Sequence, residues 1–243
     1  MNLENPTRAP QTETPPEVSP PNPAELPFSE DLVLAHLKNP EFPAERIEEL
    51  SKSTSALKSR KVRLALAAHP RTPRSLALRL IRELYTFDLM QFSLKPAPAA
   101  DLKHLADELL VSRLPSITLG ERISLARRSS TLVAAALLID KELRVWQAAL
   151  ENPRLSEAAI VKALQGRATA AFVEAVCHHA KWSMRHEVRI ALLRNQHTPL
   201  ARAVEFARAL PPSQLRDVLF ASRLPERTKA YLRRALETRN QRV

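Results

Sequence analysis

The stretch CHHAKWSMRHE, residues 177–187, gathers the side chains in this sequence that are best suited to binding a metal ion. Thiolate and imidazole groups are preferred ligands of Zn²⁺, and His179 and His186 lie seven residues apart, on one face of a helix. Neighbouring residues of a helix point about 100° apart, so Cys177, His178 and His179 cannot all ligate one ion. We therefore expect no metal site, and interpret the cluster as a partly buried thiol beside interfacial histidines.

Arginine gives the sequence a second chemical capacity, the binding of anions. The chain has a net charge of +11, and arginine outnumbers lysine. The planar guanidinium group pairs with carboxylate and phosphate groups through two parallel hydrogen bonds. The residues that we predict to bind a partner are Arg63, Arg71, Arg74, Arg154, Arg189, Arg194 and His197.

Residues that could support catalysis are few. The chain has two glycines, Gly120 and Gly166, whereas phosphate-binding loops and nucleophile elbows depend on glycine. Asp88, Asp140 and Asp217 fall near predicted helix ends, where carboxylates more often cap a helix or pair with arginine than act as general bases. The sequence therefore predicts a protein that is not an enzyme and has no cofactor and no evident small-molecule substrate.

The same composition indicates the fold class. A chain so poor in glycine is unsuited to tight β-hairpins, and its one cysteine excludes an intramolecular disulfide. No stretch approaches the 18 apolar residues typical of a membrane span, and the first residues lack the pattern of a signal peptide. We expect an all-α, cytoplasmic protein that does not contact a membrane, with Trp146 and Trp182 in its core.

A recurring proline corner indicates how the helices are arranged. In four segments a proline follows the first residue by eight positions, and a fifth segment, which starts at Val188, has Gln196 in that slot. The four segments start at Leu32, Val62, Asp88 and Val145. Weaker copies start at Ile123 and Leu215, so the average interval is about 30 residues, which is typical of helical repeats.

Three positions around the corner have predicted roles. The third position after the start is small in four copies and should allow neighbouring helices to approach closely; these residues are Ala35, Ala65, Ala148 and Ala191. The residue before the corner is asparagine in three copies, and asparagine tolerates the left-handed conformation that ends many helices. Thr72 and Thr198, each followed by proline, are predicted to cap the next helix.

The repeat predicts an α-solenoid, a superhelix of about seven stacked helix pairs. An ordinary helical bundle with recurring Asn-Pro corners is the alternative. The segments VRLALAAHPRTPRSLALRL and VRIALLRNQHTPLARAVEF, which start at Val62 and Val188, resemble the V-R-x-x-L-x-x-N-P-x-T-P-x-x-x-L pattern of leucine-rich repeat variant proteins, a HEAT-like family. The resemblance implies a right-handed superhelix. The founding type of that family carries a cysteine-ligated iron-sulfur cluster, which this chain, with one cysteine, does not share.

Two boundaries divide the chain. Residues 1–28 contain eight of the 20 prolines and have a net charge of −3, so we expect a disordered, acidic, proline-rich tail. Residues 29–243 then carry a charge of +14 and form the helical-repeat domain. The interval from Ser112 to Arg144 departs from the repeat, as an inserted helix pair or as a junction between two short arrays near residues 112–122.

The charge difference between tail and domain indicates an acidic partner, or a tail that folds back over a basic surface. We expect a non-catalytic scaffold that binds an acidic protein partner through arginines on its surface. The alternative is binding to the backbone of DNA or RNA, although aromatic residues are only 5% of the chain and no nucleic-acid-binding motif is present. A third interpretation is a structural module of a larger assembly.

Overall fold

The computed structural model describes residues 29–166 and 168–240, and within these ranges all regular secondary structure is helical. The all-α prediction is confirmed for this part of the chain, whereas the predicted tail, residues 1–28, lies outside it. The helices are α1 (Glu30–Leu37), α2 (Ala44–Lys52), α3 (Thr54–Lys58), α4 (Arg60–Ala68), α5 (Arg74–Glu83), α6 (Thr86–Leu94), α7 (Ala100–Arg113), the 3-10 turn η2 (Leu114–Ser116), α8 (Leu119–Arg128), α9 (Thr131–Leu137), α10 (Leu143–Leu150), α11 (Glu157–Gln165), α12 (Ala170–His178), α13 (His186–Arg194), α14 (Leu200–Arg208), α15 (Pro212–Phe220) and α16 (Glu226–Asn240).

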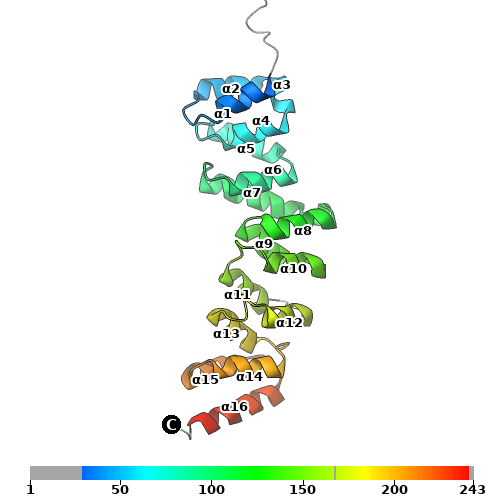
Figure 1. Ribbon diagram of the computed structural model, residues 1–243, viewed down its shortest axis with the longest axis vertical. Coiled ribbons are helices and arrows are strands. Elements are labelled where there is room, and N and C mark those ends of the chain that lie inside the picture. The colour runs from blue at the N-terminus through cyan, green and yellow to red at the C-terminus, as the bar shows by residue number, and fades with distance from the viewer. Residues whose placement is uncertain (1–28, 167, 241–243) are drawn as a thin grey trace, which may run out of the picture.

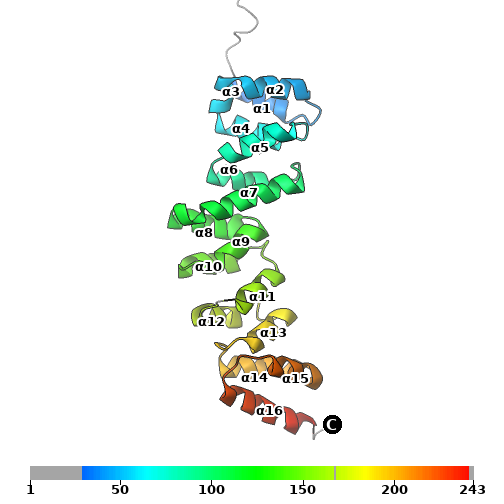
Figure 2. The same ribbon diagram turned by 180° about the vertical axis from the view of Figure 1, so that it is seen from behind.

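The helices follow one another in chain order along the long axis of an elongated molecule (Figures 1 and 2). From α4 onward they alternate between two columns, which we call A and B. Column A contains α4, α6, α8, α10, α12 and α14. At the N-terminal end of this column, α1 packs on α4. Column B contains α5, α7, α9, α11, α13 and α15, and each of these helices packs on the next. The segment near residues 112–122 comprises the end of α7, the turn η2 and the start of α8, and α7 and α9 are in contact.

The two best copies of the repeat begin in different columns. The copy that starts at Val62 begins with α4, which packs against α1 and α6 in column A. The copy that starts at Val188 begins with α13, which packs against α11 and α15 in column B. Equivalent positions of these two copies therefore lie on different sides of the stack.

Large apolar side chains form the core of the stack. Trp182 is 1% exposed, and its indole N–H donates a hydrogen bond to the carbonyl of Leu150 at 2.9 Å. Trp146 packs edge-on against Phe172, with 5.5 Å between ring centroids. Both tryptophans are core residues, as predicted. None of the helices in the described ranges is both long and apolar enough to cross a membrane.

The asparagines at the corners do not have the predicted left-handed conformation. In the described ranges no residue has a positive φ angle, and Asn195 is extended, with φ −91° and ψ 135°. Its side chain determines its role: Oδ1 accepts a hydrogen bond from the backbone N–H of His197 at 3.0 Å. Asn39 and Asn152 accept the same bond from the residue two positions later, at 3.0 and 2.8 Å. Asparagine is therefore used here for its side-chain acceptor.

The corner threonines also differ from the prediction. The N-cap of α5 is Pro73, and that of α14 is the proline that follows Thr198. The hydroxyl of Thr72 instead donates to the carbonyl of Leu66 at 2.5 Å, and the hydroxyl of Thr198 donates to the carbonyl of Leu192 at 2.6 Å. Each threonine thus adds a second hydrogen bond at the end of the preceding helix, since the carbonyl of Leu66 or Leu192 already accepts from the backbone N–H of the corner residue.

Candidate anion-binding pocket and basic groove

Two of the predicted partner-binding arginines are paired with carboxylates of the chain itself. Arg71 forms an ion pair with Glu41 and also donates to the Glu41 carbonyl at 3.2 Å. Arg74 forms an ion pair with Asp101. These pairs are exposed, so they remain available for exchange with an external anion, but each guanidinium already has a partner.

Three further predicted arginines interact with carbonyl groups at turns and helix ends. Arg63 donates to Glu83 at 3.4 Å, and Arg154 donates to Arg128 at 3.3 Å; each acceptor is the last residue of its helix. Arg189 is partly buried and donates from Nε to the carbonyl of another residue, Ser183, at 2.7 Å. Arg63 and Arg154 complement the partial negative charge of a helix C-terminus, whereas Arg189 binds a carbonyl in the turn before α13.

The predicted pairing of acidic residues with arginine is confirmed at two positions. Asp88 accepts two hydrogen bonds from Arg60, both at 3.0 Å. Asp140 accepts two from Arg122, at 2.8 and 2.7 Å. Neither carboxylate is placed to act as a general base, because the guanidinium holds both of its oxygens.

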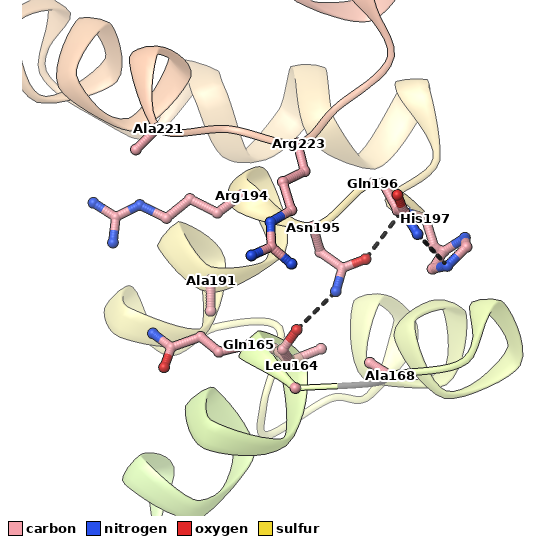
Figure 3. Close-up of a pocket in the computed structure, with 11 residues that line it drawn as sticks. Leu164, Gln165, Ala168, Ala191, Arg194, Asn195, Gln196, His197, Ala221 and Arg223 are labelled. Atoms are coloured by element: carbon pink, nitrogen blue, oxygen red, sulfur yellow. Dashed lines mark hydrogen bonds between the residues drawn. The ribbon is translucent and has the colours of Figure 1, made fainter.

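Arg194 and His197, the last two predicted residues, line the same pocket, which has a volume of about 470 Å³ (Figure 3). The pocket lies between consecutive layers of column B and is lined by Leu164, Gln165, Gly166, Ala168, Ala191, Arg194, Asn195, Gln196, His197, Ala221 and Arg223. Arg223, which the sequence analysis did not select, comes from the loop between α15 and α16. We call this site the Arg194–Arg223 pocket.

A backbone hydrogen bond fixes the two arginines beside each other. The N–H of Arg223 donates to the carbonyl of Arg194 at 3.0 Å. From there the Arg223 side chain points into the pocket toward the end of α11, and the Arg194 side chain extends along the opposite side, past Ala191 (Figure 3). The far wall is formed by His197, whose Nε2 lies 3.1 Å from the side-chain nitrogen of Gln196.

The pocket has an excess of positive charge. None of its lining residues in the described ranges is acidic, and neither guanidinium group forms a hydrogen bond or ion pair with a described residue. The C-terminal ends of α11 and α13 contribute partial negative charge that offsets part of this excess. The unpaired guanidinium donors and the nearby amides can recognise a carboxylate or a phosphate group.

A larger groove lies at the other end of the stack, across α1, α4 and α6. Its volume is about 780 Å³, and we call it the N-terminal groove. Ala35 and Ala65, two of the small repeat residues, line it, while Ala148 lines a hollow of about 440 Å³ between α8, α10 and α12 and Ala191 lines the Arg194–Arg223 pocket. The small residues were predicted to allow close helix packing. In these layers they also leave the surface hollow.

The residues of the cysteine-histidine cluster have separate surroundings. Cys177 is buried, and burial raises the pKa of its thiol to about 12. His178 bonds the carbonyl of Glu174 at 2.9 Å, and His186 lies 3.1 Å from the side-chain nitrogen of Gln214. No group of three potential metal ligands converges within the ranges described.

The sequence contains a signal that could have identified Arg223. In the weak copy that starts at Leu215, Ser222 occupies the slot that asparagine fills elsewhere. Its hydroxyl accepts from Leu224 at 3.1 Å and donates to Leu193 at 2.6 Å, as the corner asparagines do with their amides. If serine counts as a corner residue, Ser222 marks a corner in this copy. Arg223 is then the residue that directly follows a corner.

No family model, curated protein or solved structure matches the chain. The similarity to leucine-rich repeat variant proteins therefore stays an expectation from the residue pattern.

Proposed function

We propose that the chain is an α-solenoid that acts as a non-catalytic scaffold and binds an acidic protein segment. The solenoid is supported by the order of the helices along the long axis, by the contacts within column B and by the repeated corner bonds. Stacked helix pairs present a long surface to a partner while their core maintains the shape of that surface. Membership of the leucine-rich repeat variant or HEAT-like type belongs to this proposal.

The Arg194–Arg223 pocket is the observation that carries the proposal. Arg194 and Arg223 line one pocket without a carboxylate from the described chain, so an external anion bound there would compensate their charge. The walls are formed by Leu164, Ala168 and Ala221. Such a pocket accommodates an aspartate or glutamate side chain together with the methylene or methyl groups next to it.

An acidic protein segment fits this arrangement better than a nucleic-acid backbone. Binding to successive phosphates requires a row of available cations along one face. Among the predicted residues, Arg71 and Arg74 are already paired, and Arg154 lies after a column A helix whereas Arg194 ends a column B helix. The pocket also contains no aromatic side chain other than the His197 ring on which a base could stack.

Binding of a fluorescently labelled poly-glutamate peptide to the full chain tests the proposal, with random duplex DNA and single-stranded RNA measured in parallel. We would compare the wild type with R194E/R223E at about 50 and 200 mM salt. R79E/R82E is the matched control, because it changes the net charge equally at two exposed arginines of α5. Circular dichroism melting verifies that each variant is folded.

We expect the peptide to bind, and R194E/R223E to weaken it at least about tenfold more than R79E/R82E does, since each charged hydrogen bond contributes about 1.5–3 kcal/mol. Equal weakening by the two variants would show that only net charge matters and would contradict the proposed site. Steeply salt-dependent binding of DNA or RNA without peptide binding would replace the proposal with the nucleic-acid alternative.

A further inference from the structure

The N-terminal groove combines an apolar floor with lysines. Its apolar lining residues are Leu34, Ala35, Leu37, Pro40, Leu64, Ala65, Ala68, Pro70 and Ala97. Its charged lining residues are Asp31 and three lysines, Lys38, Lys61 and Lys95. Lys61 already forms an ion pair with Glu30 at 3.1 Å, whereas Lys38 and Lys95 form none with any described residue. The groove therefore has an apolar floor and more lysines than carboxylates.

Lys95 is the most informative of these residues. It follows the last residue of α6 and is only partly exposed. Burial lowers the pKa of its ammonium group, and no carboxylate in the described chain compensates for the lost hydration. Perturbed titratable groups of this kind are more frequent at binding sites than elsewhere on a surface. An acidic side chain placed in the groove would pair with this ammonium.

The chain itself contains a segment of matching chemistry next to the groove. Residues 1–28 have a net charge of −3 and eight prolines, and they immediately precede Ser29 and α1, whose residues line the groove. Proline-rich segments bind apolar grooves at a low entropic cost because their conformations are already restricted. Because the segment is joined directly to α1, whose residues line the groove, its effective concentration at the groove is on the order of millimolar.

We propose that residues 1–28 dock into the N-terminal groove of the same chain. Glutamates of the segment pair with Lys38 and Lys95, and its prolines cover the apolar floor. Because the connection is intramolecular, even a weak intrinsic affinity is sufficient for substantial occupancy. The Arg194–Arg223 pocket lies several layers away, so this docking does not depend on the function proposed for that pocket (Figure 1).

Zero-length carbodiimide crosslinking of the full chain, followed by peptide mass spectrometry, tests the docking. The reagent joins a carboxylate to an amine only where the two are in contact. We expect Glu4, Glu13 or Glu17 to be joined to Lys38 or Lys95. The ion pair between Glu30 and Lys61, at 3.1 Å, is an internal positive control.

The chain also provides negative controls. Lys162 and Lys181 are exposed lysines in distant layers, and crosslinks from the tail to them measure random encounters. Crosslinks to Lys38 and Lys95 that are at least about fivefold more frequent than those to the control lysines would support the proposal. Equal frequencies, or a Glu30–Lys61 product without products between tail and groove, would overturn it.

Two further measurements separate docking from its alternatives. In a mixture of ¹⁴N and ¹⁵N chains, an intramolecular site gives only crosslinks of one isotope, and mixed crosslinks would instead assign the groove to the tail of a second copy. In hydrogen exchange, the full-chain variant E4Q/E13Q/E17Q should exchange severalfold faster in α1 and α6 than the wild type, with α13 unchanged. Unchanged exchange in α1 and α6 would contradict the proposal.

Discussion

The amide nitrogen Nδ2 of Asn195 donates a hydrogen bond to the carbonyl oxygen of Leu164, 31 residues earlier, at 2.8 Å. Oδ1 of the same side chain accepts from the N–H of His197 at 3.0 Å. In column A, Asn152 makes the equivalent bond to Ala126, at 2.8 Å. One side chain thus closes its own corner and joins it to the preceding layer of its column. We call these bonds the corner ladder; its members are His69, Asn152, Asn195 and Ser222.

Asn152 offers the sharpest test of the corner ladder. It is 0% exposed, and its amide bonds the carbonyls of Ala126 and Ser129 and the N–H of Arg154. Asn152→Leu has a similar volume and leaves those groups without partners, so we expect the free energy of unfolding to fall by about 2–4 kcal/mol. Urea denaturation measures this change. Gln196→Leu, at an exposed site next to a corner, should change stability by less than about 0.5 kcal/mol.

The ladder also explains how much of the fold could be predicted from the sequence. Helices and corners were predicted because apolar spacing and proline are local signals. The role of the corner residue was not, because its hydrogen bonds connect layers about 30 residues apart. Asp140 and His179 cap corners too, accepting from the residue two positions later at 2.9 and 3.2 Å. Neither residue is asparagine, so the asparagine pattern did not predict these two corners. Since both columns use this corner, the repeat pattern could not assign α13 to column B.

The candidate site was only partly predictable for a similar reason. Sequence identifies an arginine but not whether a carboxylate of the chain will neutralise it. Arg71 forms an ion pair with Glu41 of the preceding layer. Arg194 instead lies beside a second arginine, Arg223 of the following layer, whose backbone N–H donates to its carbonyl. Lys95 was not among the predicted residues, because its partial burial depends on the packing of α1, α4 and α6.

The ion pair between Arg122 and Asp140 should contribute far more to stability than the surface pairs. Its side chains are 23% and 9% exposed, against 67% and 60% for Arg46 and Glu49. Asp140→Asn removes the charge that balances a largely buried guanidinium, so we expect a loss of about 2–4 kcal/mol. Glu49→Gln should cost less than about 1 kcal/mol. Thermal or urea unfolding of both variants makes the comparison, and similar losses would contradict the distinction between buried and exposed pairs.

Asp107 and Asp101 should respond to pH in opposite directions. Burial raises the pKa of Asp107, and hydrogen bonds from Ser130 and Ser93 only partly oppose it. Its contribution to stability is therefore fully present below the unfolded-state pKa and declines as pH rises through the folded-state pKa. We expect Asp107→Asn to raise the melting temperature at neutral pH, by an amount that disappears toward about pH 4.

The matched control for that experiment is Asp101→Asn. The hydrogen bond from Arg74 lowers the pKa of Asp101, so its stabilising contribution is present at neutral pH and is lost as pH falls through the folded-state pKa. This variant should therefore lower the melting temperature at neutral pH and have no effect in acid. If Asp107→Asn also lowered the melting temperature at neutral pH, the ionised carboxylate of Asp107 would be making a favourable interaction larger than the cost of its burial.

Cys177 should be unreactive in the folded chain. It is 0% exposed, and burial raises the pKa of its thiol to about 12. The thiolate is the nucleophile that attacks a thiol reagent, and the reagent must reach it, so labelling at about pH 8 should proceed no faster than unfolding. Mass spectrometry during labelling, with and without denaturing urea, measures the difference. An exposed thiol placed by Gln196→Cys in a Cys177→Ser background should label at once under native conditions.

The same thiol predicts how stability changes in alkali. Because its folded-state pKa is raised from 9.0 to about 12, its contribution is complete below about pH 9 and decreases as pH rises toward 12. The wild type should therefore lose about 1.4 kcal/mol per pH unit in this range relative to Cys177→Ala, which has no thiol to ionise. Tyrosines and lysines titrate in both proteins, so their effects cancel in the comparison. Parallel stability profiles above pH 9 would mean that the thiolate is accommodated in the fold, with Arg202, whose charge favours it, as a compensating cation.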